Sequence, residues 1–238
     1  MAYQAVFRRY EMKYLLSLQQ KQRILAAMEP YMQLDHYGRT VIRNVYFDTR
    51  QYQLIRQSLE KPVYKEKLRL RSYHQTGPGE PVFVELKKKY DGVVYKRRLT
   101  MPQEAAFSWI CGQQRREDSQ IAREITYFKD FYRDLQPVVF LSYEREAYYS
   151  LDGSDFRVTF DHQIQCREDR LSLSEDAGGI AILPGDKVLM EVKTAGAIPL
   201  WLTSVLSQEQ IYKTSFSKYG AAYQTLLFPQ LQGGYIRA

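Results

Sequence analysis

Alternating ionic and apolar residues are the feature that most constrains how this chain can fold. Between residues 64 and 73 every second position, from Lys65 to Arg71, is basic. Leu68 and Leu70 stand between these cations. A period of two places successive side chains on opposite faces of a β-strand. This segment is therefore expected to form a strand with one apolar face and one positively charged face.

Segments with this period recur along the chain and predict about eight strands, at residues 6–13, 40–48, 64–73, 82–89, 93–100, 138–148, 156–165 and 188–194. Turns rich in Asp and Gly, at 90–92 and 152–155, are typical of antiparallel hairpins. Residues 75–81 and 168–179 have the composition of loops. Helices are expected at 18–29, 102–110, 119–135, 199–206 and 217–227. Ser17 and Gln20 are expected to form a capping box for helix 18–29, and Asp118 is expected to cap helix 119–135. The pattern predicts an α+β fold.

Positive charge is concentrated on one face of the predicted sheet. The ionic strand faces hold 13 basic and four acidic residues, whereas the whole chain has a formal net charge of only +7. Like charges on neighbouring strands destabilise each other, so such a face needs an anionic partner. An open sheet would be a basic platform for nucleic acid, and a closed one a basic tunnel with helices packed outside. Solvated strand faces without a ligand are the third interpretation.

The residue types on this face favour a polyphosphate chain. Arginine and lysine neutralise phosphoryl oxygens, and a few carboxylates can hold a divalent metal that bridges them. Nucleic acid would favour aromatic residues on the binding face, for base stacking. Of the 20 tyrosines, Tyr73 and Tyr143 lie on the ionic face, but most others do not. A closed tunnel that binds no nucleic acid is therefore expected.

Composition sets the broad class. With 45% hydrophobic and 26% charged residues the chain is expected to fold, as one domain spanning residues 1–238. No apolar run approaches the length of a transmembrane helix, and no secretory leader is recognised. Cys111 and Cys166 have no disulfide or zinc spacing. A cytoplasmic location is expected, and membrane association through a partner stays open.

Eight short motifs, taken together, resemble the VTC (vacuolar transporter chaperone) domain of polyphosphate polymerases, in the CYTH/triphosphate tunnel metalloenzyme superfamily. They are RYEMKY at 9–14, YFDT at 46–49, KLRLR at 67–71, VELK at 84–87, YER at 143–145, RVTFD at 157–161, MEVK at 190–193 and SFSKY at 215–219. The resemblance spans roughly residues 5 to 226. It implies an eight-stranded antiparallel β-barrel, a tunnel with a basic lumen and helices outside.

The resemblance also implies roles for individual residues. The expected catalytic residues are Arg69, Arg71, Lys87, Arg145, Arg157 and Lys218. The expected substrate-binding residues are Lys13, Lys67, Lys96, Tyr143, Lys193 and Ser217, and Glu191 is the expected ligand of Mn²⁺ or Mg²⁺. The hydrolytic branch begins with an ExExK strand, whereas here Arg9 occupies the first position. One metal carboxylate is thus missing, which favours the polymerase.

The expected activity is transfer of the γ-phosphoryl group of ATP to a growing polyphosphate chain, with ATP and inorganic polyphosphate as the partners. A triphosphatase or polyphosphatase on the same scaffold is one alternative. A non-catalytic module that binds polyphosphate or nucleic acid is another. Asp48 is interpreted as a turn or strand-end cap; Lys88 and Arg97 are interpreted as solvated. The histidines are interpreted as surface or loop residues: His36, His74 and His162.

Overall fold

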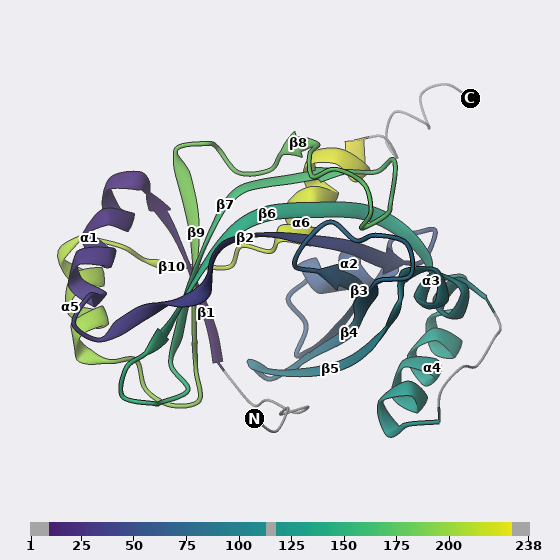
Figure 1. The fold of residues 1–238 in the computed structure, drawn as a ribbon, viewed down its shortest axis with the longest axis horizontal. Coiled ribbons are helices and arrows are strands. Elements are labelled where there is room, and N and C mark those ends of the chain that lie inside the picture. The colour runs from purple at the N-terminus through teal and green to yellow at the C-terminus, as the bar shows by residue number, and fades with distance from the viewer. Residues whose placement is uncertain (1–9, 113–117, 230–238) are drawn as a thin grey trace.

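The computed structural model describes residues 10–112 and 118–229, which form one curved sheet with helices packed against it (Figure 1). The strands are β1 (Tyr10–Ser17), β2 (Met32–Asp48), β3 (Tyr64–Ser72), β4 (Pro81–Tyr90), β5 (Val93–Pro102), β6 (Gln136–Ser150), β7 (Arg157–Arg167), β8 (Ile180–Ala181), β9 (Lys187–Thr194) and β10 (Lys213–Thr214). The helices are α1 (Leu18–Met28), α2 (Gln53–Leu59), α3 (Gln103–Cys111), α4 (Gln120–Tyr132), α5 (Leu200–Gln208) and α6 (Lys218–Ala222), which continues into a π-helical turn (Tyr223–Leu227).

All the strand pairs are antiparallel, as expected, but the sheet does not close into a barrel. Its order is β10-β1-β9-β7-β6-β2-β3-β4-β5, with β8 on β7. In the described part of the chain no ladder joins β5 to the other end. One reason is that β10 occupies the outer edge of β1, where Lys13 pairs with Thr214 and Tyr14 with Lys213. The expectation of a closed eight-stranded barrel was therefore wrong, and the sheet is curled but open.

The extent of several elements differs from the sequence prediction. The strand β2 begins at Met32, eight residues before the predicted start, and pairs along the whole of the long strand β6. Its first half lacks the alternation that marks the second. The predicted strand 6–13 is seen as β1 from Tyr10 onward, and residues 6–9 lie outside the described chain. The Gln20 and Ser17 capping box is confirmed, whereas Ser119 rather than Asp118 caps α4.

A helix that the periodicity did not predict, α2, is held by Asp48. Asp48 Oδ1 accepts hydrogen bonds from the backbone N–H groups of Thr49 and Leu54, and its Oδ2 accepts one from that of Ile55. The hydroxyl of Tyr219 donates to Oδ2 at 2.8 Å. Asp48 is therefore a strand-end cap, as interpreted from the sequence, and it also ties α6 to the end of β2.

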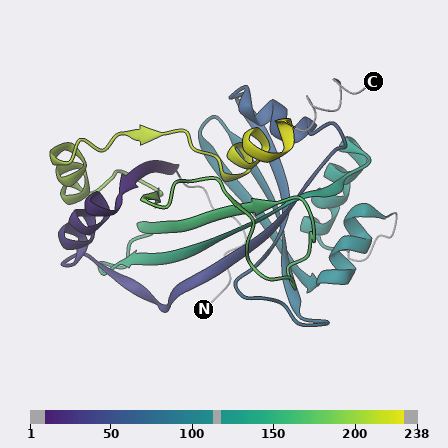
Figure 2. The same cartoon turned by 90° about the horizontal axis from the view of Figure 1, so that it is seen from above.

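The outer face of the sheet is apolar, as predicted, and the helices cover it at both ends (Figures 1 and 2). Helices α3 and α4 bury Trp109 and Phe128 against β2–β5, and α1 and α5 bury Ile24 and Leu202 against β1, β7 and β9. Helices α2 and α6 differ, because they pack against one end of the inner face, where their apolar residues form a third cluster with Ile42, Tyr46 and Tyr143. The rest of the inner face carries polar and charged side chains.

Three residues expected at the surface instead make ion pairs or hydrogen bonds on the outer side of the sheet. His162 lies on β7, half-buried, with Nε2 3.0 Å from Lys21 Nζ. Lys88 and Arg97 are partly buried and lie 3.7 Å and 3.1 Å from Glu124 of α4. The reason is similar in each case, because a helix packed over the strand brings a partner to it: the carboxylate of Glu124 to Lys88 and Arg97, and the ammonium donor of Lys21 to His162. The other two histidines are exposed, as expected: His36 and His74.

Candidate functional site

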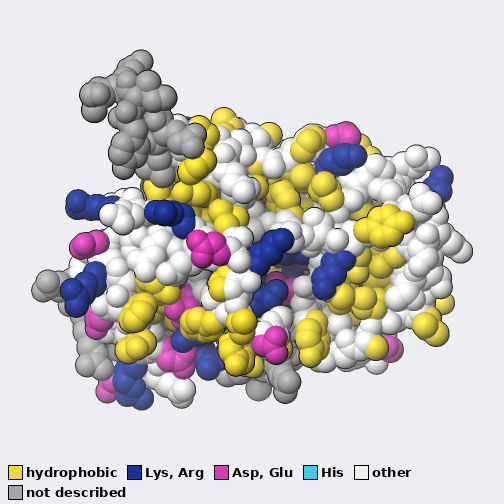
Figure 3. All heavy atoms as spheres, turned by 180° about the vertical axis from the view of Figure 1, so that it is seen from behind, with side chains coloured by type: hydrophobic (Ala, Val, Ile, Leu, Met, Phe, Trp, Pro, Cys, Tyr) yellow, Lys and Arg dark blue, Asp and Glu magenta, His cyan; other side chains and the backbone are white. Residues whose placement is uncertain are grey.

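The inner face of the curled sheet lines a cavity of about 1670 Å³. Basic side chains (dark blue) gather near the middle of the face shown in Figure 3, with acidic ones close by. The cavity lining contains 15 basic and three acidic residues within the described chain. All thirteen residues proposed from the sequence line it: Lys13, Lys67, Arg69, Arg71, Lys87, Lys96, Tyr143, Arg145, Arg157, Glu191, Lys193, Ser217 and Lys218.

Glu85, on β4, is fully buried and neutralises four cations. Its Oε2 accepts hydrogen bonds from Arg69 Nε at 2.9 Å and Nη2 at 2.7 Å. Its Oε1 accepts one from Arg98 Nε at 2.8 Å. Arg71 Nε lies 3.7 Å from Oε2, and Lys96 Nζ lies 3.6 Å from Oε1. Burial alone would raise the pKa of Glu85, but the charges of Arg71 and Arg69 hold it well below its usual range, so the carboxylate stays ionised.

Tyrosine and asparagine side chains fix the direction of the two arginines on β3. Arg69 Nη1 donates to Tyr46 Oη at 2.9 Å. Arg71 Nε donates to Asn44 Oδ1 at 2.9 Å, and its Nη2 donates to Tyr143 Oη at 3.0 Å. Because Tyr143 accepts from an arginine, its own O–H proton is available to an acceptor in the cavity. Guanidinium groups held in this way present a preformed fork to an oxyanion.

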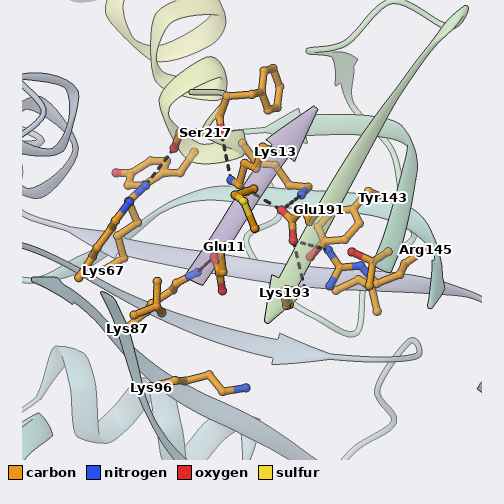
Figure 4. Close-up of a pocket in the computed structure, with 18 of the residues that line it drawn as sticks. Glu11, Lys13, Lys67, Lys87, Lys96, Tyr143, Arg145, Glu191, Lys193 and Ser217 are labelled. Carbon is orange, nitrogen blue, oxygen red and sulfur yellow. Dashed lines mark hydrogen bonds and ion pairs between the residues drawn. The ribbon is translucent and has the colours of Figure 1, made fainter. Parts of the chain in front are cut away.

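A second buried cluster lies on the opposite wall, around Glu191 of β9 and Asp161 of β7 (Figure 4). Arg145 donates to both oxygens of Asp161, at 2.6 and 2.7 Å, and to Glu191 Oε2 at 3.2 Å. Lys218 Nζ lies 2.5 Å from Asp161 and 2.9 Å from Glu191, and Lys193 Nζ lies 3.4 Å from Glu191. Burial would raise the pKa of Glu191, but these cations hold it well below its usual range.

The strand β1 adds a cation and a carboxylate at the open side of the sheet. Lys13 Nζ donates to the carbonyl of Phe216 at 2.8 Å and lies 3.6 Å from Glu191. Lys87 Nζ, on β4, donates to Glu11 Oε2 at 2.7 Å. This last ion pair spans the gap between the two arms of the sheet, as Figure 4 shows. Burial would raise the pKa of Glu11, but Lys87 and Lys193 lower it to about 2.

Lys67 is the cavity cation that lacks a counter-ion most clearly. Its Nζ donates to Ser217 Oγ at 3.0 Å, and no described carboxylate lies within 4 Å of it. Burial, together with the charges of Lys13 and Lys87, lowers the pKa of Lys67 well below its ordinary value. A bound polyanion would supply the missing negative charge.

Arg157 differs from the other residues proposed from the sequence. It lines the cavity from the first position of β7, paired in the ladder with Lys193, but its side chain is exposed. It therefore lies at an edge of the cavity, whereas Arg145 lies in the buried cluster. A contact with a ligand that extends out of the cavity is the role that this position allows.

Several residues that hold the site together were not among those predicted from the sequence. Glu85, Asp161 and Arg98 form the cores of the two clusters, and Tyr46 orients Arg69. The alternation placed the first three on the ionic face. However, period two says only which face a residue lies on, and a counter-ion is recognised only when the strands that carry its partners are placed beside each other.

The residues present fit a metal ion only in part. In residues 10–112 and 118–229 no group of three His, Cys, Asp or Glu side chains could hold one. Both oxygens of Glu191 already contact cations. Mg²⁺ and similar ions take about six oxygen ligands. Glu191 therefore suits a divalent metal only where phosphate oxygens of a bound ligand and water supply the remaining ligands.

The sequence matches the VTC domain family over residues 8–227, nearly the whole chain. The chain belongs to the VTC domain family. The resemblance seen in the motifs is thereby confirmed. No curated protein matches this VTC domain. Within the described residues, no helix combines the length and apolar character that crossing a membrane requires.

Two solved structures resemble this VTC domain in fold. A putative adenylate cyclase from Bacillus halodurans is 16% identical, with a TM-score of 0.57, and the match covers 90% of this chain and 96% of that one. A putative adenylyl cyclase from Hippeastrum, described as having a dominant triphosphatase activity, is also 16% identical, with a TM-score of 0.55 and coverage of 92% and 96%. At this identity the likeness establishes a shared fold alone.

The Glu85 cluster predicts a large effect on stability. Replacing Glu85 by Gln leaves its four cations without a buried counter-charge, so the free energy of unfolding should fall by about 3–5 kcal/mol. Urea denaturation measures this loss. Glu80→Gln is the control, because Glu80 is exposed and precedes the same strand; it should change little. A Glu85→Gln protein as stable as the wild type would show that the cluster does not depend on this carboxylate.

Proposed function

We propose that this VTC domain is a metal-dependent polyphosphate polymerase that uses ATP. The observation that carries the proposal is the excess of cations in the cavity, 15 basic against three acidic lining residues in the described chain. The buried Glu85 and Asp161 leave this excess largely uncompensated. A ligand with several consecutive negative charges matches it, and a linear polyphosphate has one charge for each phosphoryl group along its length.

In the proposed reaction an oxygen of the terminal phosphate of a polyphosphate chain attacks the γ-phosphorus of ATP. The bond between that phosphorus and the β,γ-bridging oxygen breaks, and ADP leaves. The arginines that Glu85 and the tyrosines hold in place, Arg69 and Arg71, would bind the triphosphate on one wall, and Arg145 and Lys218 would bind it on the other. Positioning and charge neutralisation supply the rate enhancement, so no side-chain nucleophile is needed.

Mn²⁺ or Mg²⁺ is part of this proposal, with Glu191 as the protein ligand. Such a metal would neutralise charge on the phosphate oxygens that it bridges. Lys87, Lys96, Lys193 and Ser217 would bind the same phosphates, and Lys13 and Lys67 would contact them near α6. Arg157 would contact the part of the chain that leaves the cavity. The free cysteines agree with a cytoplasmic location, which we also propose: Cys111 and Cys166.

Hydrolysis of triphosphate on the same scaffold is the second candidate. One observation favours it: Glu11 is bound through Oε2 alone, and in the described residues nothing is hydrogen-bonded to its Oε1. A second carboxylate oxygen near Glu191 could help to orient water or a metal. The Hippeastrum protein, which shares the fold, is described as a triphosphatase. In that reaction water replaces the attacking phosphate.

Incubation of the pure protein with ATP and Mn²⁺ separates these functions. A polymerase gives long polyphosphate, a hydrolase gives free phosphate only, and a binding module gives neither. Arg69→Gln should lower turnover at least a hundredfold, because it removes a fixed phosphate ligand. Arg97→Gln, on the outer face of β5, is the matched control and should retain activity. Equal loss in both variants, with folded protein by circular dichroism, would mean that the cavity is not the active site.

The pH dependence of triphosphate binding provides an independent check. Burial lowers the pKa of Lys96 to about 8, and burial together with Arg145 lowers that of Lys193 to about 8. Each lysine loses its charge as the pH rises through 8, so each should weaken binding by about tenfold between pH 7 and pH 9. Titration calorimetry with tripolyphosphate measures the dissociation constant. In a variant with arginine at both positions the side chains stay charged, so its affinity for tripolyphosphate should vary less with pH. A wild-type affinity that is constant between pH 7 and pH 9 would contradict the prediction.

The metal proposal is tested at Glu191. Glu191→Gln keeps the shape of the side chain and removes its charge, so kcat should fall far more than the affinity for triphosphate, because the surrounding cations still hold the ground state. Mn²⁺ is titrated against both proteins, with and without triphosphate. Metal should bind the wild type measurably only when triphosphate is present. Turnover that needs no metal, or a fully active variant, would remove Glu191 from this role.

A further inference from the structure

Buried arginines also occur on the outer face of the sheet, away from the cavity. Arg43 of β2 is 9% exposed and Arg167 of β7 is 6% exposed. The segment between β7 and β8 passes this end of the sheet next to α3 (Figure 1), where Gln103 of α3 bonds to Ser172 and Leu173. Two guanidinium groups are therefore enclosed at the same end of the outer face.

Arg43 has no partner of opposite charge in contact. No described residue forms a hydrogen bond or ion pair with it, and its Nε is buried without an acceptor. Burial lowers the pKa of Arg43, and the negative charge of Asp176 opposes this shift, but the two side chains are too far apart to form an ion pair. A buried charge without a counter-ion is costly, and such groups in folded proteins are normally paired or bound to a ligand. The Nε of Arg43 therefore lacks an acceptor within the described protein.

Ser72 supplies a second donor at the same place. It lies directly opposite Arg43 in the ladder between β3 and β2, so the two side chains share a face. Its Oγ is also buried and has no hydrogen-bond partner. Two neighbouring donors without acceptors, one of them charged, point to an anion rather than to a cation or an apolar ligand.

Arg167 adds positive potential without offering a carboxylate to Arg43. Its guanidinium donates to backbone carbonyls of the β7–β8 segment, those of Asp169, Arg170, Asp176 and Gly178. It also stacks on the ring of Phe140, 3.6 Å from the ring centroid. The charge of Arg167 therefore remains uncompensated by any contacting acid in the described chain. Arg167 is near Arg43, and the acids that act on it, Asp169 and Glu175, form no ion pair with either guanidinium in the described chain.

We propose that Arg43 and Ser72 form a binding site for a small oxyanion, inorganic phosphate, on the outer face of the sheet. A guanidinium fork and a hydroxyl match the oxygens of a tetrahedral phosphate. The site lies back to back with the cavity, since the chain neighbours of these two residues, Asn44 and Arg71, bond to each other on the inner face. It is separate from the proposed polymerase site.

Thermal unfolding tests the proposal. Tripolyphosphate is first added to saturation, so that the cavity is occupied, and inorganic phosphate is then titrated. Phosphate should raise the melting temperature of the wild type and of the control Arg39→Met, whose arginine lies on the same strand but is exposed and paired with Glu144 and Glu146. It should not raise that of Arg43→Met. Without phosphate, Arg43→Met should be at least as stable as the wild type, because it removes an unpaired buried charge.

Equal responses to phosphate in the wild type and Arg43→Met would overturn the proposal, as would no response in the wild type. If Arg43→Met does not fold, Ser72→Ala provides the comparison and should weaken the response. Crystals of the wild type soaked in selenate give a direct test: an anomalous peak within hydrogen-bond distance of Arg43 is expected, and its absence would also overturn the proposal. None of these measurements depends on turnover of ATP, so the outcome is independent of the proposed polymerase activity.

Discussion

Charge neutralisation by buried carboxylates is the interaction on which the inner face of this sheet depends. Cations placed on adjacent strands repel one another, and the repulsion is strongest where water is excluded. Glu85 on one wall and Glu191 with Asp161 on the other each contact several of these cations. The carboxylates permit a strand pattern that would otherwise be unstable, and they do so without balancing the total charge.

This partial neutralisation links stability to binding. The cations next to Glu85 are held in one direction by its oxygens and by tyrosines, so a ligand meets side chains that are already ordered. Little conformational entropy is then lost when phosphate binds. Lys67, by contrast, has only Ser217 as a hydrogen-bond partner in the described chain and gains most from an added anion. The same carboxylates that stabilise the cavity thus also hold its cations in place for the polyanion that we propose.

The sequence alone predicted the α+β class, the antiparallel pairing, the apolar outer face and the set of residues that line the cavity. Period two assigns the strand residues to their faces, whereas Ser217 and Lys218, at α6, came from the resemblance to the VTC domain. The prediction of a closed barrel was wrong, because closure requires both edge strands to be free for pairing. The edge of β1 is instead occupied by β10, a strand of two residues that is too short to be recognised in the sequence. The partners of Glu85, which lies on β4, come from β3 and β5, and a pattern within one strand cannot identify contacts with its neighbours.

The open edge of the sheet has a topological consequence. A barrel closed by backbone hydrogen bonds can receive a linear polymer only by its end, which must be threaded through the pore. Here the two arms of the sheet meet through the side chains of Lys87 and Glu11, across a seam that no described ladder crosses. Added salt screens such an ion pair far more than it weakens a β-ladder. Lateral entry of a chain, with its ends still engaged elsewhere, is thus compatible with this architecture, and it would become easier as ionic strength rises.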